Sequence, residues 1–158
     1  MTILGIDPGL SQTGYAILNT RDKNIDSAVF GCITTSPKLS LENRLSKIYQ
    51  DLKKIIKKHR PDKIAIEQLF FCKNVKTALK VGQSRGVIYL LAAQGKIPIY
   101  EITPLQVKQA VTGYGRAEKK QVQVMMKMIL NLKHLPEPDD AADALAIAYC
   151  FFQTKKFK

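Results

Sequence analysis

The chain has 158 residues, a length that suits one domain with a single hydrophobic core. Its 25 lysine and arginine residues exceed its 13 aspartate and glutamate residues, and the formal charge of +12 favours a polyanionic partner, although a solvated lysine-rich helix end over residues 53–60 accounts for part of it. The odd number of cysteines, with no CxxC pair, argues against a zinc site or a disulfide framework. No apolar stretch reaches the length of a membrane span. Because the sequence also lacks a signal-like start and its cysteines suit a reducing compartment, we expect a cytoplasmic protein.

The first apolar stretch, ILGID over residues 3–7, predicts a short buried strand that ends on Asp7. Pro8 and Gly9 then break the strand, because proline cannot donate a ladder hydrogen bond and glycine accepts a sharp turn. Taken alone, Asp7 could simply open an Asp-Pro-Gly turn. A catalytic interpretation therefore depends on other acids that join it.

Two more strands, over residues 13–18 and 25–35, predict an antiparallel meander, because a parallel return needs a crossover of about a dozen residues or more. A helix with an apolar stripe over residues 39–58 supplies such a crossover, and the strand after it ends on Glu67. A right-handed crossover makes that strand parallel to its neighbour. If the neighbour is the first strand, Asp7 and Glu67 lie at the same edge of the sheet.

The second half of the chain alternates helices with one further strand. We expect a long helix over residues 73–94, a strand from Ile97, a short helix over 104–111, a basic loop over 112–120 and a helix over 118–132. On the long helix, Ala78, Gly82 and Gly86 form a smooth stripe. Such a stripe suits close contact with the sheet or with a second copy of the protein.

The last helix begins near Asp139 and places Asp140 and Asp143 on one face. Helix capping explains one or two of these acids. It does not explain Asp143, which lies in the small, apolar segment AADALAIA, where an isolated charge is costly to bury.

The predicted architecture is α/β, with a mixed five-stranded sheet and helices on both of its faces. We expect one domain over residues 1–153 and a basic tail, 154–158, that is disordered.

We infer that four acids meet at the carboxyl edge of the sheet: Asp7, Glu67, Asp140 and Asp143. Without a cation such acids raise one another's pKa, and ligation by carboxylates alone suits Mg²⁺, for which Mn²⁺ can substitute. Two such ions about 4 Å apart can hold the attacking water and the departing oxygen of a phosphodiester. The acids and the basic surface together predict metal-dependent hydrolysis of nucleic acid.

Five segments, in order over nearly the whole chain, resemble the RuvC family of bacterial Holliday junction resolvases: GIDPGLSQTGYAI, AIEQLFF, KNVKTALKVGQSRG, PLQVKQAVTGYGRAEKKQV and DDAADALAIA. The resemblance implies a ribonuclease H-like fold and an Mg²⁺-dependent endonuclease with two ions in each active site. It implies resolution of four-way junctions in DNA recombination and repair, by paired symmetric nicks that leave 5′-phosphate and 3′-hydroxyl ends. It also implies a homodimer that works with the branch-migration proteins RuvA and RuvB.

The resemblance also assigns roles to single residues. The metal-binding catalytic acids are Asp7, Glu67, Asp140 and Asp143, while Asp139 is left out. Phe70 resembles the aromatic residue that stacks on unpaired bases, with the adjacent Phe71 as the alternative. The basic residues expected to contact DNA are Lys73, Arg85, Lys108, Arg116, Lys119 and Lys120. For Lys108 and Lys119, which resemble the family's contacts to the scissile backbone, a solvated helix face is the alternative.

At Phe151 many family members have a histidine, so any proton-transfer role of that histidine is absent or belongs to another group. Three rival functions share some of these features. Sugar kinases and actin-like ATPases share the opening Gly-Ile-Asp-x-Gly, but 158 residues leave no room for their two lobes. A ribonuclease H acting on RNA–DNA hybrids and a junction-binding protein without cleavage are distinguished by substrate choice and by mutation of Asp7.

Overall fold

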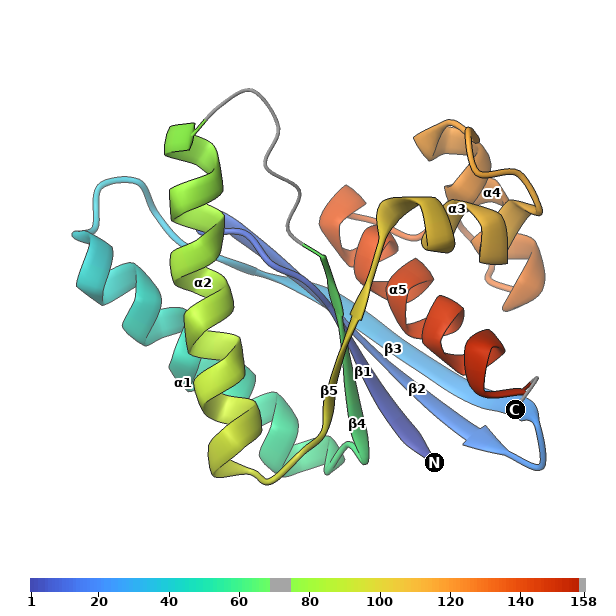
Figure 1. Ribbon diagram of the computed structural model, residues 1–158, viewed down its shortest axis with the longest axis horizontal. Helices are drawn as coiled ribbons and strands as arrows, with labels where there is room; N and C mark the ends of the chain where they lie inside the picture. Colours follow the sequence, from blue (N-terminus) through green and yellow to red (C-terminus); the bar gives the residue numbers. More distant parts are fainter. Residues whose placement is uncertain (69–74, 157–158) are drawn as a thin grey trace.

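The computed structural model describes residues 1–68 and 75–156, with the backbone alone for 75–77 and 155–156. The chain forms a sheet that lies between two groups of helices (Figure 1). The elements in chain order are β1 (Thr2–Asp7), β2 (Gln12–Arg21), β3 (Asn24–Thr34), α1 (Leu41–His59), β4 (Lys63–Glu67), α2 (Val75–Gln94), β5 (Ile99–Ile102), α3 (Pro104–Thr112), α4 (Lys119–Ile129) and α5 (Asp139–Lys156).

The sheet has five strands in the order β3-β2-β1-β4-β5. Strands β1, β2 and β3 form the predicted antiparallel meander, whereas β4 pairs with both β1 and β5 in parallel. Ile6 of β1 lies opposite Ile66 of β4, so both strands end at the same edge. The predicted α/β architecture and the parallel pairing of the two acid-bearing strands are confirmed.

Alternation along β1 divides the core between the two faces of the sheet, because successive side chains of a strand point to opposite sides. Leu4 and Ile6 pack in the cluster that includes Ile48 of α1 and Ile88 of α2. Ile3 packs in the other cluster, which is built on α3, α4 and α5. Figure 1 shows α1 and α2 together on one side of the sheet and α3, α4 and α5 on the other. Asp7 has the same parity as Ile3 and therefore belongs to the α5 side.

Two glycines allow helix α5 to lie directly on the sheet. A Cβ atom at Gly5 would stand 2.2 Å from the carbonyl oxygen of Ala144, and one at Gly14 would stand 1.8 Å from that of Asp140. Gly14 is also the residue that pairs with Asp7 across the β1–β2 ladder. The first turn of α5 is thereby brought above the end of β1.

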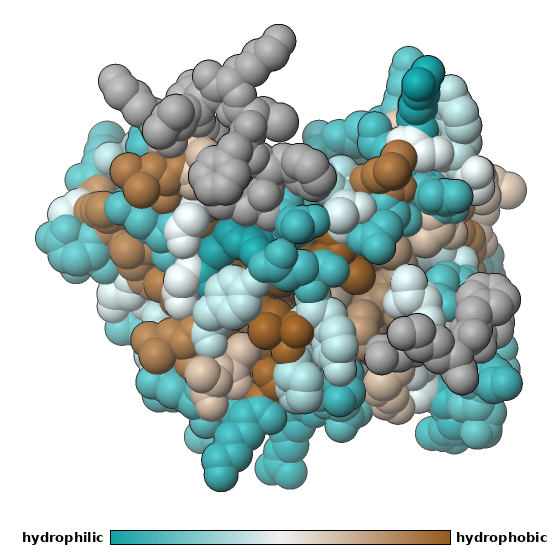
Figure 2. All heavy atoms as spheres, viewed as in Figure 1, coloured by the Kyte–Doolittle hydropathy of each residue, from teal (hydrophilic) through white to brown (hydrophobic). Residues whose placement is uncertain are grey.

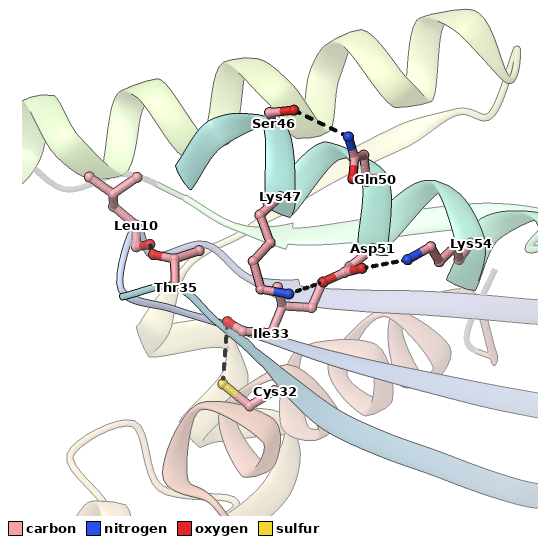
Figure 3. A network of polar contacts seen from close by, with 9 residues as sticks. All are labelled: Leu10, Cys32, Ile33, Thr35, Ser46, Lys47, Gln50, Asp51 and Lys54. Atoms are coloured by element: carbon pink, nitrogen blue, oxygen red, sulfur yellow. Dashed lines mark hydrogen bonds and ion pairs between the residues drawn. The ribbon is translucent and has the colours of Figure 1, made fainter. Parts of the chain in front are cut away.

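The turn after β1 is tied to the rest of the fold by hydroxyl groups. The Thr35 hydroxyl donates to the carbonyl oxygen of Leu10 at 2.6 Å (Figure 3). Arg44 of α1 donates to the hydroxyls of Thr35 and Ser11 at 2.9 and 2.8 Å. The Thr13 hydroxyl donates to the carbonyl oxygen of Gly9 at 2.6 Å. These bonds fix the backbone immediately beyond Asp7.

Several boundaries differ from the sequence-based prediction, among them the end of β2, which extends to Arg21 rather than 18, and three further ones have a cause visible in the structure. Strand β5 begins at Ile99 rather than Ile97, because the Ile97 amide still donates to the carbonyl oxygen of Ala92 in the turn that ends α2. Helix α4 ends at Ile129 rather than near 132, because Asn131 has a φ of 50° and the Leu132 amide returns to the carbonyl oxygen of Lys127.

The third difference concerns the C-terminal segment. Helix α5 continues to Lys156, so residues 154–156 extend the domain instead of forming a separate tail. The Thr154 hydroxyl donates to the carbonyl oxygen of Phe151 within this helix, and Phe151 is buried against the ring of Tyr100. Among the described helices, none combines the length and apolar character needed to cross a bilayer.

We predict that Gly14→Ala lowers the free energy of unfolding by about 1–3 kcal/mol or more, because the added methyl group collides with the backbone of α5. Gly86→Ala is the matched control, since a Cβ there meets nothing within 4 Å, and it should be neutral or stabilising by up to about 1 kcal/mol. Urea unfolding at low protein concentration measures both. Equal stability of Gly14→Ala and wild type would contradict the close packing of α5.

Candidate active site

The four predicted acids come from three elements that meet at one edge of the sheet. Asp7 ends β1 and Glu67 ends β4, one position beyond the Ile6–Ile66 pair, so both side chains have the parity of the α5 face. Asp140 and Asp143 lie in the first turns of α5, which Gly5 and Gly14 admit to that face. The structure therefore brings the acids of distant segments to one region.

The pKa of Asp7 reflects the neighbouring acids. Burial, followed by the negative charges of Glu67, Asp143 and Asp140 in that order, raises the pKa of Asp7 to about 7, against a smaller opposite effect of Lys119. An isolated turn aspartate would feel none of these charges. Asp7 thus belongs to an acidic cluster that strongly favours a bound cation or proton.

The other acids are perturbed in the same direction. Burial and then Asp143 raise the pKa of Glu67, while Arg85 and Lys119 lower it. Burial raises the pKa of Asp143, and a hydrogen bond from Lys119 partly opposes this rise. The cluster is thus short of positive charge, and Lys119 supplies part of it.

Lys119 links the beginnings of α4 and α5. Its ammonium group lies 2.8 Å from Asp143 and 3.3 Å from Asp139. Asp139 also accepts a hydrogen bond from the Gln123 side chain at 2.8 Å and points toward solvent, with 66% of its side chain exposed. Asp139 therefore joins the two helices, in agreement with its omission from the predicted catalytic acids.

A cavity of about 200 Å³ opens beside the acids. Glu67 and Asp143 line it on the acidic side, and Lys108 of α3 and Lys119 of α4 on the basic side. Its remaining walls are apolar and are formed by Pro104, Val107, Val122 and Ile147. One small cavity thus presents both carboxylates and ammonium groups, the combination that suits a cation bridging to a phosphate.

The donor set fits a hard divalent cation, because all four acids offer oxygen atoms and each of the three with a shifted pKa is disfavoured as a bare carboxylate. Within the described residues, however, no group of three or more acidic, histidine or cysteine side chains is arranged so that it could hold a metal ion. Asp143 is instead paired with Lys119.

The predicted DNA contacts fall into four groups. Lys108 and Lys119 line the cavity, whereas Arg116 is exposed and Lys120 borders a separate apolar hollow of about 390 Å³ near Tyr114. Arg85 is 7% exposed and bonded to protein groups, so it is not a surface contact for DNA, and that expectation is corrected. The predicted DNA contacts that lie outside the described residues are Phe70, Phe71 and Lys73.

Sequence reasoning missed the polar network around Arg85. The guanidinium group of Arg85 forms an ion pair with Glu101 at 2.6 Å and also donates to Tyr89 and to the backbone carbonyl of Glu67. No sequence signal pointed to this network, because the pairing of Glu101 with Ile66, which places Glu101 on the face of the sheet that carries α2, is a feature of the folded sheet.

Comparison with known proteins gives consistent results. The family model described as crossover junction endodeoxyribonuclease RuvC matches residues 3–151. The protein of that name from Finegoldia magna is 53% identical over 158 residues, which is all of this chain and 96% of that protein, and the one from Thermosipho melanesiensis is 51% identical over 99% of this chain and all of that protein. Thermus thermophilus RuvC in complex with Holliday junction substrate superimposes with a TM-score of 0.92 at 33% identity, covering 99% of this chain and 96% of that one.

We predict that Asp7→Asn stabilises the metal-free protein near pH 8. In the folded protein Asp7 keeps its proton up to about pH 7, whereas an unfolded aspartate loses it near pH 4, so the stability of the wild type falls as the pH rises between these values. Because one pKa unit corresponds to about 1.4 kcal/mol, the gain should reach at most about 4 kcal/mol near pH 8 and less than half of that near pH 5.

Urea unfolding in EDTA at the two pH values measures this gain. Asp26→Asn serves as the control, because Asp26 lies on the surface beside Arg21 and should show no such pH-dependent gain. A lower stability of Asp7→Asn than of wild type near pH 8 would show that Asp7 is not part of a repelling cluster.

Proposed function

The chain belongs to the RuvC family of crossover junction endodeoxyribonucleases, and from this premise we propose how its own residues cut a Holliday junction. It is a nuclease of DNA recombination and repair with a ribonuclease H-like fold, and nucleases of this family depend on a metal ion. The observation that carries the proposal is the mutual electrostatic effect of the acids on Asp7. It supports a cation-binding site at the edge of the sheet.

We propose Mg²⁺ as the metal, with two ions in each active site and Mn²⁺ as a substitute. The residues that would hold them are Asp7, Glu67, Asp140 and Asp143. Bound ions supply charge for the phosphate oxygens and lower the pKa of the attacking water. The cleavage would leave a 5′-phosphate and a 3′-hydroxyl end.

The lysines of the cavity have a complementary task in this proposal. In the free protein, Lys119 neutralises the charge of Asp143. Once Asp143 ligates a cation, the ammonium group of Lys119 becomes available to the scissile phosphate. Lys108 faces the same cavity from α3. Both groups would hold the strand in place, since an ammonium group binds phosphate as a point charge.

Further contacts with the junction are proposed on the family resemblance. Arg116 and Lys120 lie on the basic loop and helix beside the cavity and would contact phosphates. Lys73 and the stacking of Phe70, or of Phe71, on unpaired bases are retained as proposals. Arg85 is withdrawn from this set because its guanidinium group is used inside the protein.

We propose that the protein acts as a homodimer through helix α2. Among the described residues, a Cβ at Gly82 or Gly86 would meet nothing within 4 Å, which supports an open stripe over the alternative of packing on the sheet. Leu79 and Leu90 on the same helix are 64% and 51% exposed, and apolar groups follow this helix in the space-filling view (Figure 2). A twofold dimer also supplies two active sites for two symmetric nicks.

The remaining partners follow from the family. We propose that the protein cooperates with the branch-migration proteins RuvA and RuvB and works in the bacterial cytoplasm, where recombining DNA is found.

We predict that Asp7→Asn and Asp143→Asn abolish nicking and keep the affinity for a four-way junction within about 2-fold, because the basic residues that meet phosphate are untouched. A labelled immobile junction with Mg²⁺ measures nicking, and gel mobility in EDTA measures binding. Asp26→Asn is the control and should cut normally. Normal cutting by either active-site variant, or faster cutting of an RNA–DNA hybrid by wild type, would contradict the proposal.

We predict that Gly82→Arg converts the dimer to a monomer, because the added side chain occupies the open stripe of α2 and places like charges opposite each other across the twofold axis. Sedimentation equilibrium measures the mass. On a cruciform plasmid the variant should produce single nicks in place of paired ones. Lys54→Arg, an exchange of one exposed basic residue for another on α1, is the control and should stay dimeric.

A further inference from the structure

Arg85 is a buried cation that touches the strand end carrying one of the catalytic acids. Only 8% of its side chain is exposed, and it lies on α2, on the opposite face of the sheet from α5. Its Nη2 atom forms an ion pair with Glu101 of β5 at 2.6 Å and donates to the Tyr89 hydroxyl at 3.2 Å. Tyr89 in turn donates to the same carboxylate. The Nη2 atom is therefore held by two protein groups.

The other nitrogen of the fork, Nη1, donates to the backbone carbonyl of Glu67. Glu67 is the last residue of β4. The backbone amide of the next residue, Gln68, still donates to the carbonyl oxygen of Ile102 at 2.8 Å. Arg85 thus holds the strand end from one face while the Glu67 carboxylate projects toward the other. One rigid guanidinium fork links three elements at this point: β4, β5 and α2.

We infer that Arg85, held by Glu101 and Tyr89, is a positioning residue that sets the backbone of Glu67 and thereby the direction of its carboxylate toward the metal. This inference rests on the proposed role of Glu67 as a metal ligand. Groups that orient a ligand from behind typically change metal affinity or activity about 10–100-fold when they are removed. Arg85 makes no contact with the metal or the substrate in this role.

The test replaces the whole ion pair, because removal of Arg85 alone would leave the Glu101 carboxylate without its cation and confuse misfolding with loss of positioning. The double variant Arg85→Met, Glu101→Met keeps the volume and removes both charges and the bond to the Glu67 carbonyl. The matched control replaces a surface ion pair, Arg21→Met with Asp26→Met, whose partners lie 3.4 Å apart.

Three measurements follow on each protein. Electron paramagnetic resonance of free Mn²⁺ gives the dissociation constant of the metal, gel mobility in EDTA gives junction binding, and nicking is followed at increasing Mn²⁺. For the double variant we expect a Mn²⁺ dissociation constant about 10-fold higher, junction affinity within about 2-fold of wild type, and slow nicking that recovers in part at high Mn²⁺. The surface-pair control should behave as wild type in all three.

A folded double variant with wild-type Mn²⁺ affinity and wild-type nicking would overturn the inference. Glu67→Gln separates this outcome from failure of the underlying proposal. If Glu67→Gln binds Mn²⁺ and cuts normally, Glu67 is not a ligand and the proposed function of that residue fails. If Glu67→Gln is inactive while the double variant is normal, Glu67 is a ligand and only its positioning by Arg85 is refuted.

Discussion

The site depends on the close approach of helix α5 to the backbone of the sheet. At Gly5 and Gly14 the helix lies where any side chain would collide with its carbonyl groups. This contact brings the first turns of α5 over the end of β1, so Asp140 and Asp143 meet Asp7. A helix held one side chain farther away would separate the acids by several ångström, which is enough to weaken both their repulsion and their capacity to share a cation.

The acidic cluster serves the proposed metal site but lowers the stability of the metal-free protein. Burial and mutual repulsion raise the pKa of Asp7, Glu67 and Asp143. A bound cation would offset this electrostatic repulsion, which is uncompensated in the metal-free protein. Lys119 compensates part of this charge through Asp143 and Asp139. Two structural cations serve the site from opposite faces of the sheet, because Lys119 contacts a carboxylate from α4 whereas Arg85 contacts the backbone behind Glu67 from α2.

Helix α2 has two roles in this arrangement. Its inner face carries Arg85 and Ile88 toward the sheet, and its outer face exposes Gly82, Gly86 and Leu90. The proposed dimer contact and the proposed positioning of Glu67 therefore belong to the same helix. Any displacement of α2 on dimer formation would reach the end of β4 through the Arg85 guanidinium group as well as through the apolar packing of α2, because Arg85 bonds to the Glu67 carbonyl.

The sequence by itself determined most of the strands and helices, the parallel direction of the strand that ends on Glu67, and a shared edge for Asp7 and Glu67 on the condition that β1 and β4 are neighbours, because alternation, helical periodicity and the crossover rule are local or topological constraints. Asp7 and Glu67 could be placed together for this reason. Only the tertiary structure decided that Arg85 is interior, that Asp139 joins α4 to α5, and that the glycine stripe of α2 is open. These features depend on distances between side chains of different elements, and the periodicity of one segment carries no information about what faces it across the core.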